Sequence, residues 1–165
     1  MIYSPIDASV NEDIAVPNSE PEQVVNGILC TTCTMPGVED YADAAILEME
    51  PWCPTPIQMV GENQKSNEVL FQGAFILVHL RAGCNEVETT YCNQSMRISS
   101  PIPDLSTGDL ICLIATGKTT AKVLEICRPP FNPETTYLEG EAIPKERYQL
   151  MKAKIDEICL RNIEV

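Results

Sequence analysis

The sequence of 165 residues contains a single histidine, His79. Any nucleophilic system that pairs a serine or cysteine with histidine would have to use this side chain as its base. A metal site built from several histidines is excluded within one chain. His79 stands in the apolar stretch ILVHLRA, residues 76–82, where a lone histidine is more typical of a strand end than of a catalyst. We therefore predict no catalytic residue and no enzyme activity.

Basic residues are also few, with 11 lysines and arginines against 24 aspartates and glutamates and a net charge of −13. The acidity lies almost entirely in residues 1–72, which contain 12 acidic residues and one lysine. Phosphate backbones are bound by clustered lysine and arginine side chains, and the sequence has no such cluster. The charge pattern therefore predicts no nucleic-acid and no membrane partner. It favours a protein partner with a basic surface, and a homo-oligomer stays open.

The sequence lacks a long hydrophobic run. The longest one, AFILVHL at residues 74–80, is far shorter than the about 20 residues that span a bilayer. The first residues, MIYSPIDASVNED, contain neither the basic region nor the apolar core of a secretory signal. We therefore predict no signal peptide, no transmembrane segment, and a location in the cytoplasm or in a virion.

Cysteine, in contrast, is frequent, and several of the eight cysteines stand inside apolar patterns such as LICLI and LEICR. A reduced cysteine behaves as a small core hydrophobe, so we expect these side chains to pack rather than to react. Cys84 and Cys92 could alternatively face each other across a hairpin.

The run LCTTCTMP, residues 29–36, resembles the thioredoxin active site in the spacing of its two cysteines. The resemblance implies a redox dithiol with a lowered thiol pKa. The same pair could instead form half of a zinc site. We predict no cofactor and no metal site, and the fallback candidates for one are Cys30, Cys33, His79 and Cys84.

Aromatic residues make up only 5% of the chain, so aliphatic side chains and cysteine must fill the core. Residues 1–23 predict an extended acidic arm, and residues 24–165 predict one β-rich domain. Apolar patterns predict strands, and their expected ranges are 22–33, 57–60, 68–81, 87–98, 109–115 and 120–127. The last two ranges would form a hairpin around TGKT. Residues 38–50 predict a short helix.

Residues 144–163 predict a C-terminal helix, because Pro144 fits the first helical position and apolar residues recur at helical spacing. Clustered strands and one late helix predict a mainly β fold, an antiparallel sandwich or small barrel, with an α+β fold as the alternative. On this scaffold we expect a non-enzymatic module that acts in protein assembly or surface display, such as a capsid-associated domain. The alternatives are a thiol-based redox protein and a zinc-stabilised adaptor.

The hexapeptide EVLFQG, residues 68–73, resembles the site that picornaviral 3C proteases cut between Gln72 and Gly73. A protease site needs an exposed and flexible peptide, whereas this one continues directly into the most apolar run of the chain. We interpret the hexapeptide as part of a buried strand.

Overall fold

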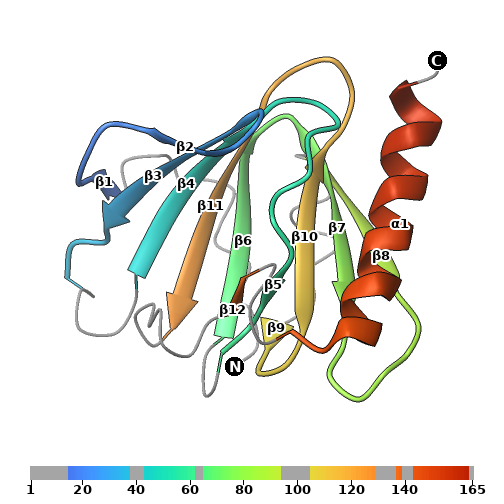
Figure 1. Ribbon diagram of the computed structural model, residues 1–165. Coiled ribbons are helices and arrows are strands. Elements are labelled where there is room, and N and C mark those ends of the chain that lie inside the picture. Colours follow the sequence, from blue (N-terminus) through green and yellow to red (C-terminus); the bar gives the residue numbers. More distant parts are fainter. Residues whose placement is uncertain are drawn as a thin grey trace.

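The structure, a computed structural model, describes residues 15–37, 43–61, 65–93, 105–128, 137–138 and 143–163. These residues form two antiparallel β-sheets that face each other, and a C-terminal helix that packs on the outside of one of them (Figure 1). The predicted fold class is therefore confirmed: the described chain is mainly antiparallel β, with a helix at its end.

The larger sheet has the strand order β1-β3-β4-β11-β6-β9, and β2 also pairs with β3. Its strands are β1 (Val16–Pro17), β2 (Glu22–Val25), β3 (Ile28–Thr34), β4 (Asp43–Met49), β6 (Lys65–Gln72), β9 (Leu105–Ser106) and β11 (Ala121–Arg128). The smaller sheet has the order β12-β5-β10-β7-β8. Its strands are β5 (Gln58–Met59), β7 (Ala74–Leu80), β8 (Glu88–Asn93), β10 (Leu110–Ala115) and β12 (Tyr137–Leu138).

Aliphatic side chains fill most of the space between the sheets. Alternate residues of a strand point to opposite faces, and the inward set includes Leu47, Met49, Leu70, Leu77, Leu113 and Val123. Burying one such side chain stabilises the fold by about 1.5–3 kcal/mol. The outward residues of β7 and β10 are apolar as well, because the helix covers them. This double burial explains why both strands are continuously hydrophobic in the sequence.

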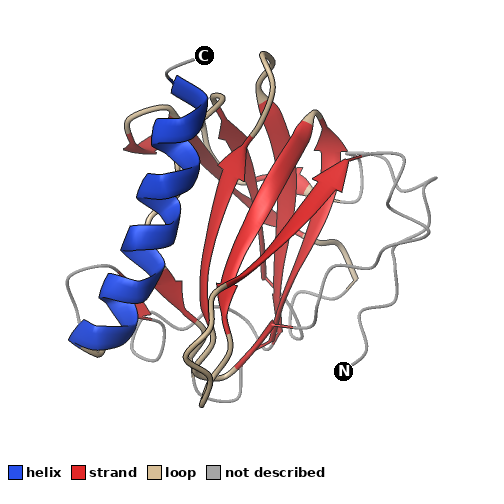
Figure 2. Ribbon diagram, turned by 90° about the vertical axis from the view of Figure 1, so that its right-hand side faces the viewer, coloured by secondary structure: helices blue, strands red, loops and turns tan. Residues whose placement is uncertain are grey.

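Helix α1 (Lys145–Ile163) lies along the outer face of the smaller sheet (Figure 2). Pro144 directly precedes its first residue, so the predicted C-terminal helix is confirmed. Met151 and Ile155 are buried against Val78 and Leu110. Arg147, near the start of the helix, donates hydrogen bonds to four carbonyl oxygens in the loops at one end of that sheet.

The prediction of one strand at residues 68–81 is wrong, because Gly73 divides this range into β6 and β7, which lie in different sheets. Gly73 has a φ of +78°, a left-handed conformation that lets β6 turn away into β7. Residues 68–72 of the hexapeptide EVLFQG thus lie within β6, which pairs with β11, and Glu68 and Leu70 are buried. This position agrees with the interpretation as a strand.

The predicted helix at residues 38–50 is wrong in its described part, which is β4. Alanine, glutamate, leucine and methionine favour a helix in isolation. Here, however, Ala44 and Ile46 face an apolar cluster outside the sheet, while Leu47 and Met49 face the core between the sheets. Burial on both faces and pairing with both β3 and β11 override the local helix propensity.

The predicted hairpin of residues 109–115 and 120–127 is also wrong. β10 pairs with β5 and β7, whereas β11 pairs with β4 and β6, so the TGKT turn leads from one sheet to the other. The division into an arm at 1–23 and a domain at 24–165 stays a prediction. In the described part of that arm, β1 and the start of β2 pair with β3. Within the described ranges, no helix combines the length and hydrophobicity that crossing a bilayer requires.

Replacing Gly73 by alanine should destabilise the protein by about 2–4 kcal/mol, because an added Cβ would lie 3.0 Å from the backbone of both Thr120 and Ala121. Gly117 is the matched control: its φ is also +78°, but no described atom lies within 4 Å of an added Cβ. Its replacement should cost only about 1 kcal/mol. Urea unfolding of both variants measures the difference, and equal losses would contradict the close approach at the corner.

Candidate functional site

The inner face of the larger sheet changes from apolar to polar along its strands. The strand registers place four apolar or thiol side chains in one row, namely Cys30, Leu47, Val123 and Leu70. Two residues further along each strand, the next row consists of Thr32, Ala45, Glu125 and Glu68. Both rows point to the same interior, because the side-chain period of a strand is two. An apolar layer is therefore followed by a layer with two carboxyl groups.

Glu68 on β6 and Glu125 on β11 are direct neighbours across the sheet. The Cβ atoms of such neighbours lie about 4.5–5.5 Å apart, close enough for two carboxylates to repel each other. Glu68 is fully buried, with 0% of its surface exposed. Burial raises the pKa of Glu125 to about 7. A like charge on a neighbouring strand disfavours ionisation, so the position of Glu68 acts in the same direction as the burial of Glu125.

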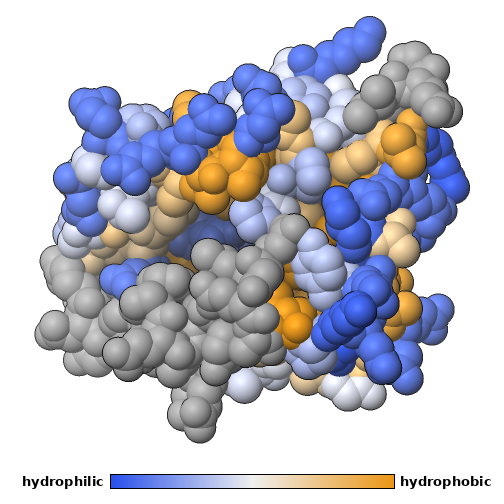
Figure 3. Space-filling model, viewed as in Figure 1, coloured by the Kyte–Doolittle hydropathy of each residue, from blue (hydrophilic) through white to orange (hydrophobic). Residues whose placement is uncertain are grey.

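Glu125 lines a cavity of about 160 Å³ between the two sheets. The other lining residues are Val24, Ile28, Cys30, Leu47, Thr55, Pro56, Gln58, Ile111 and Leu113. Figure 3 shows a hollow in the surface of the protein, and hydrophobic atoms lie along part of the edge of this hollow. A molecule in the cavity would contact mostly apolar side chains and would meet the carboxyl group of Glu125 at one end.

The segment between β4 and β5 forms one wall of this cavity, and β10 holds it in place. The amide of Thr55 donates to the carbonyl oxygen of Leu113 at 3.0 Å. The amide of Leu113 in turn donates to Thr55 Oγ1 at 2.9 Å, and Cys112 Sγ donates to the Thr55 carbonyl oxygen at 3.2 Å. These bonds fix the wall although the segment is not a regular strand.

The cysteines closest to the two carboxyl groups are protonated thiols. Burial and then the charge of Glu125 raise the pKa of Cys30. Burial and then the charge of Glu68 raise the pKa of Cys92 to about 11. The thiolate, not the thiol, is the nucleophile and the metal ligand. Cys30 and Cys92 therefore contribute packing surface to the interior rather than reactive sulfur.

The structure does not bring the four fallback candidates together. Cys30 points into the interior, whereas Cys33 points to the opposite side of β3. Cys84 is exposed in the loop after β7, and His79 is buried. Among the described residues, no three His, Cys, Asp or Glu side chains are placed to hold a metal ion. The dithiol and zinc interpretations thus have no geometric support in the described part of the chain.

His79 belongs to a hydrogen-bond network that joins loops. It is 1% exposed, and its Nε2 lies 3.1 Å from Asp109 Oδ2. Because an ionised carboxylate only accepts, Nε2 carries the hydrogen. The amides of Ser106 and Ala82 also donate to this carboxylate, at 3.0 and 2.8 Å. Burial alone would raise the pKa of Asp109, but the hydrogen bonds from His79, Ser106 and Ala82 hold it below its usual value.

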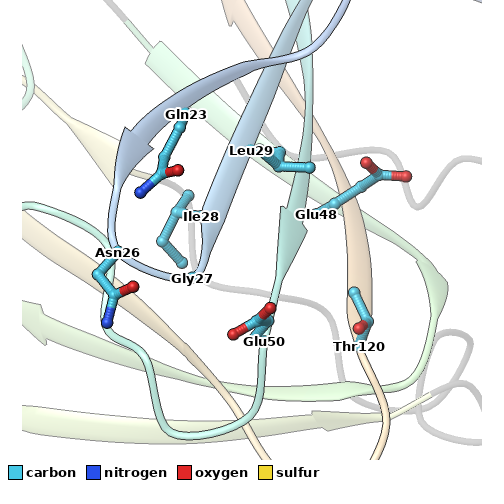
Figure 4. Close-up of a pocket in the computed structure, with 8 residues that line it drawn as sticks. All are labelled: Gln23, Asn26, Gly27, Ile28, Leu29, Glu48, Glu50 and Thr120. Carbon is cyan, nitrogen blue, oxygen red and sulfur yellow. The ribbon is translucent and has the colours of Figure 1, made fainter.

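A larger recess of about 430 Å³ lies at the turn between β2 and β3. It is lined by Gln23, Asn26, Gly27, Ile28, Leu29, Glu48, Glu50 and Thr120. Figure 4 shows that its side-chain amides and carboxylates are spread around the recess rather than turned to one point. Without converging groups this acidic recess does not define a site, so the smaller interior cavity is the stronger candidate although it has less volume.

Two facing antiparallel sheets that enclose a cavity with a carboxyl group define a double-sheet β-barrel. The capsular polysaccharide assembling protein CapF from Staphylococcus aureus is similar, with a TM-score of 0.58 and 13% identity over 72% of this chain and 34% of that one. Oxalate decarboxylase from Lactobacillus farciminis is similar with a TM-score of 0.55 and 14% identity, over 73% of this chain and 33% of that one.

A mutant of the Bacillus subtilis oxalate decarboxylase OxdC has a TM-score of 0.59 and 12% identity, over 84% of this chain and 34% of that one. The present chain thus spans about a third of the length of these proteins. No protein-family model matches the sequence, and no curated protein matches it. At these identities the likeness shows the fold.

These comparisons correct the predicted function. The expected non-enzymatic module for assembly or surface display is wrong, because the similar structures include oxalate decarboxylases, which are enzymes. The prediction that the protein is no enzyme is overturned by the same finding, since enzymes are built on this fold.

Glu68 and Glu125 are site residues that the sequence analysis misses. Each glutamate is one of the alternate residues of its strand that point inward. Glu68 is two residues from Leu70, and Glu125 is two residues from Val123. A carboxylate at a position where the alternation of the strand otherwise places apolar residues is the signal that could have identified each glutamate on its own. Their proximity depends on the pairing of β6 with β11, which are distant in the sequence, and no local pattern reveals that pairing.

Among the cysteines whose side chains are described, Cys84 should react fastest with iodoacetamide in the native protein, because it is exposed. The buried Cys33, Cys92 and Cys112 should react only after unfolding. Peptide mass spectrometry after a short labelling pulse measures the order. A native disulfide between Cys30 and Cys33 would contradict their placement on opposite faces of β3.

Replacing Asp109 by asparagine should destabilise the protein by about 2–4 kcal/mol, because the carboxylate accepts three hydrogen bonds in a buried place. The lowered pKa gives the sign of the pH dependence. The contribution of Asp109 is present above the ordinary aspartate pKa of about 3.9 and is lost as the pH falls through the lower folded value.

The control is Asp156→Asn, which removes an exposed ion pair with Lys152 and should change stability by less than about 0.5 kcal/mol. Urea unfolding at pH 7 and at pH 3 compares the variants. The difference between wild type and Asp109→Asn should shrink at the lower pH, and a constant difference would argue against an ionised Asp109.

Proposed function

We propose that the protein binds a small molecule in the interior cavity and that Glu125 exchanges a proton with it, as the acid–base group of an enzyme. The observation that carries this proposal is a carboxyl group with a pKa of about 7 at the polar end of an otherwise largely apolar cavity. A group that titrates near the working pH is present both as acid and as base, which efficient general acid–base catalysis requires. Perturbed groups in cavities are typical of functional sites.

Glu68 supports Glu125 from behind rather than contacting the ligand. It is fully buried on the neighbouring strand, and Glu125 is the carboxyl group that lines the cavity. A charge on Glu68 opposes ionisation of Glu125, so the proton stays with the pair until a ligand compensates the charge. Thr55 and Gln58 add neutral hydrogen-bonding groups to the lining. The hydroxyl oxygen of Thr55 already accepts a hydrogen bond, so its hydrogen is the part left to donate.

The cavity volume limits the size of the ligand. A protein cavity of roughly 150 Å³ holds one benzene molecule, and this cavity is about 160 Å³. We therefore expect a ligand of roughly five to eight non-hydrogen atoms. The fold is compatible with a small reactant, since one of the similar structures is an oxalate decarboxylase in complex with formate. A protein partner with a basic surface and a homo-oligomer stay predictions beside this proposal.

Replacing Glu125 by glutamine should remove a pH dependence of stability that the wild type shows. The raised pKa means that the folded protein holds a proton that the unfolded chain releases near 4.5. The stabilisation by this proton is present below about pH 4.5 and is lost as the pH rises through about 7. One pKa unit corresponds to about 1.4 kcal/mol, so the loss is on the order of 3 kcal/mol.

Urea unfolding at pH 4.5 and pH 8 measures this loss in the wild type and in Glu125→Gln. The matched control is Glu48→Gln, which changes a carboxylate on the outer face of β4 and should behave like the wild type. Carboxyl ¹³C shifts should also show one glutamate that titrates near pH 7 and is missing in Glu125→Gln. Titration of Glu125 in the ordinary range near pH 4 would overturn the proposal.

A further inference from the structure

We infer that the cavity takes small amines in their ammonium form and rejects small carboxylate anions. The inference deepens the proposed function, on which it rests, by naming the chemical class of the ligand.

The charges around the cavity are of one sign. Glu125 is the charged residue in its lining, and Glu68 lies directly behind it on β6. None of the described lysine, arginine or histidine side chains lines the cavity. His79 is inside the barrel but is bonded to Asp109. Lys122 also lies on β11, but it is one of the residues that point away from the cavity. Its charge acts in the direction of lowering the pKa of Cys33, on the outer face of the sheet.

This charge pattern decides between ligands by electrostatic compensation. An anion would meet the carboxyl group of Glu125 and no cation among the described lining residues, so its desolvation would not be offset. An alcohol would gain one neutral hydrogen bond. An ammonium group would compensate the negative charge of the pair and form a charge-assisted hydrogen bond, in surroundings where unscreened charges interact strongly. The net charge of −13 adds a long-range attraction for cations.

Binding of an ammonium ion should therefore be coupled to ionisation of Glu125. The titratable groups that face Glu125 are Glu68 from β6 and Cys30 from β3. The polar groups that the smaller sheet and its preceding loop contribute, Gln58 and Thr55, do not titrate. The raised pKa of Cys30 keeps that thiol neutral. Affinity for an amine should thus rise as the pH increases through about 7, where Glu125 loses its proton.

Three probes with the same carbon skeleton test the charge class: isobutylamine, isobutanol and isobutyrate. Each has roughly five or six non-hydrogen atoms and fits a cavity of this size. Their dissociation constants are measured from methyl chemical shifts of Ile111 and Leu113, which line the cavity. At pH 8 isobutylamine should bind at least roughly tenfold more tightly than isobutanol, as expected for a charge-assisted hydrogen bond, and isobutyrate more weakly than either.

Two variants assign the preference to Glu125. In Glu125→Gln the amine should bind no more tightly than the alcohol, while binding of the alcohol persists. Glu125→Asp keeps the charge and should keep part of the preference for the amine over the alcohol. It replaces Glu125→Gln in this test if the glutamine variant does not fold. Glu48→Gln, on the outside of the sheet, should bind all three probes as the wild type does.

The outcomes separate the inference from the proposed function. Equal binding of amine and alcohol by the wild type would overturn the charge class and leave the small-molecule site in place. Preferred binding of isobutyrate would overturn it as well. If none of the three probes shifts the cavity methyl groups, both the inference and the proposed small-molecule site are wrong. An amine preference that persists in Glu125→Gln would place the recognition elsewhere and overturn the inference.

Discussion

The placement of two carboxyl groups, Glu68 and Glu125, inside the barrel is the constraint on which its interior depends. They stand directly opposite each other on β6 and β11, on the face that points inward. The side chains that surround them in the described core are mostly apolar, and charges in such surroundings interact more strongly than in water. Burial raises the pKa of Glu125 to about 7. Burial, and then the charges of Glu125 and Glu68, keep the neighbouring Cys30 and Cys92 protonated. The chemistry of the cavity and the inertness of its sulfur thus both follow mainly from the burial of ionisable groups.

The position of this pair depends on a framework that lies outside the cavity. Asp109 ties the loop after β7 to the turn before β10 through three hydrogen bonds. Arg147 of α1 donates to carbonyl oxygens in the same two loops, so the terminal helix fixes that end of the smaller sheet. Thr55, in turn, holds the cavity wall against β10. Polar residues that resemble catalytic groups in the sequence, His79 above all, therefore serve to position the sheets that enclose Glu125.

The sequence predicts the parts of this fold that depend on local pattern. The helical spacing after Pro144 predicts α1, and the apolar pattern of residues 68–81 predicts strand structure, although it does not show that β6 and β7 are separate strands. It fails where long-range pairing decides. β4 has helix-forming residues but lies between two strands, and the turn before β11 has the composition of a hairpin although it joins two sheets. The site is missed for the same reason, because Glu68 and Glu125 come together only through the register of β6 and β11.

The pair also contradicts the rule by which the rest of the core is built. An uncharged residue at either position would extend the apolar row of Leu70 and Val123 and would remove a desolvation cost on the order of 3 kcal/mol for Glu125 alone. A loss of that size is a large fraction of the roughly 5–15 kcal/mol by which a typical domain is stable. Natural sequences break such local rules mainly at functional sites, where the strain or charge has a use. The apolar cavity beside Glu125 leaves room for the proposed ligand next to this carboxyl group, and the proposed function would account for a charge that packing alone would remove.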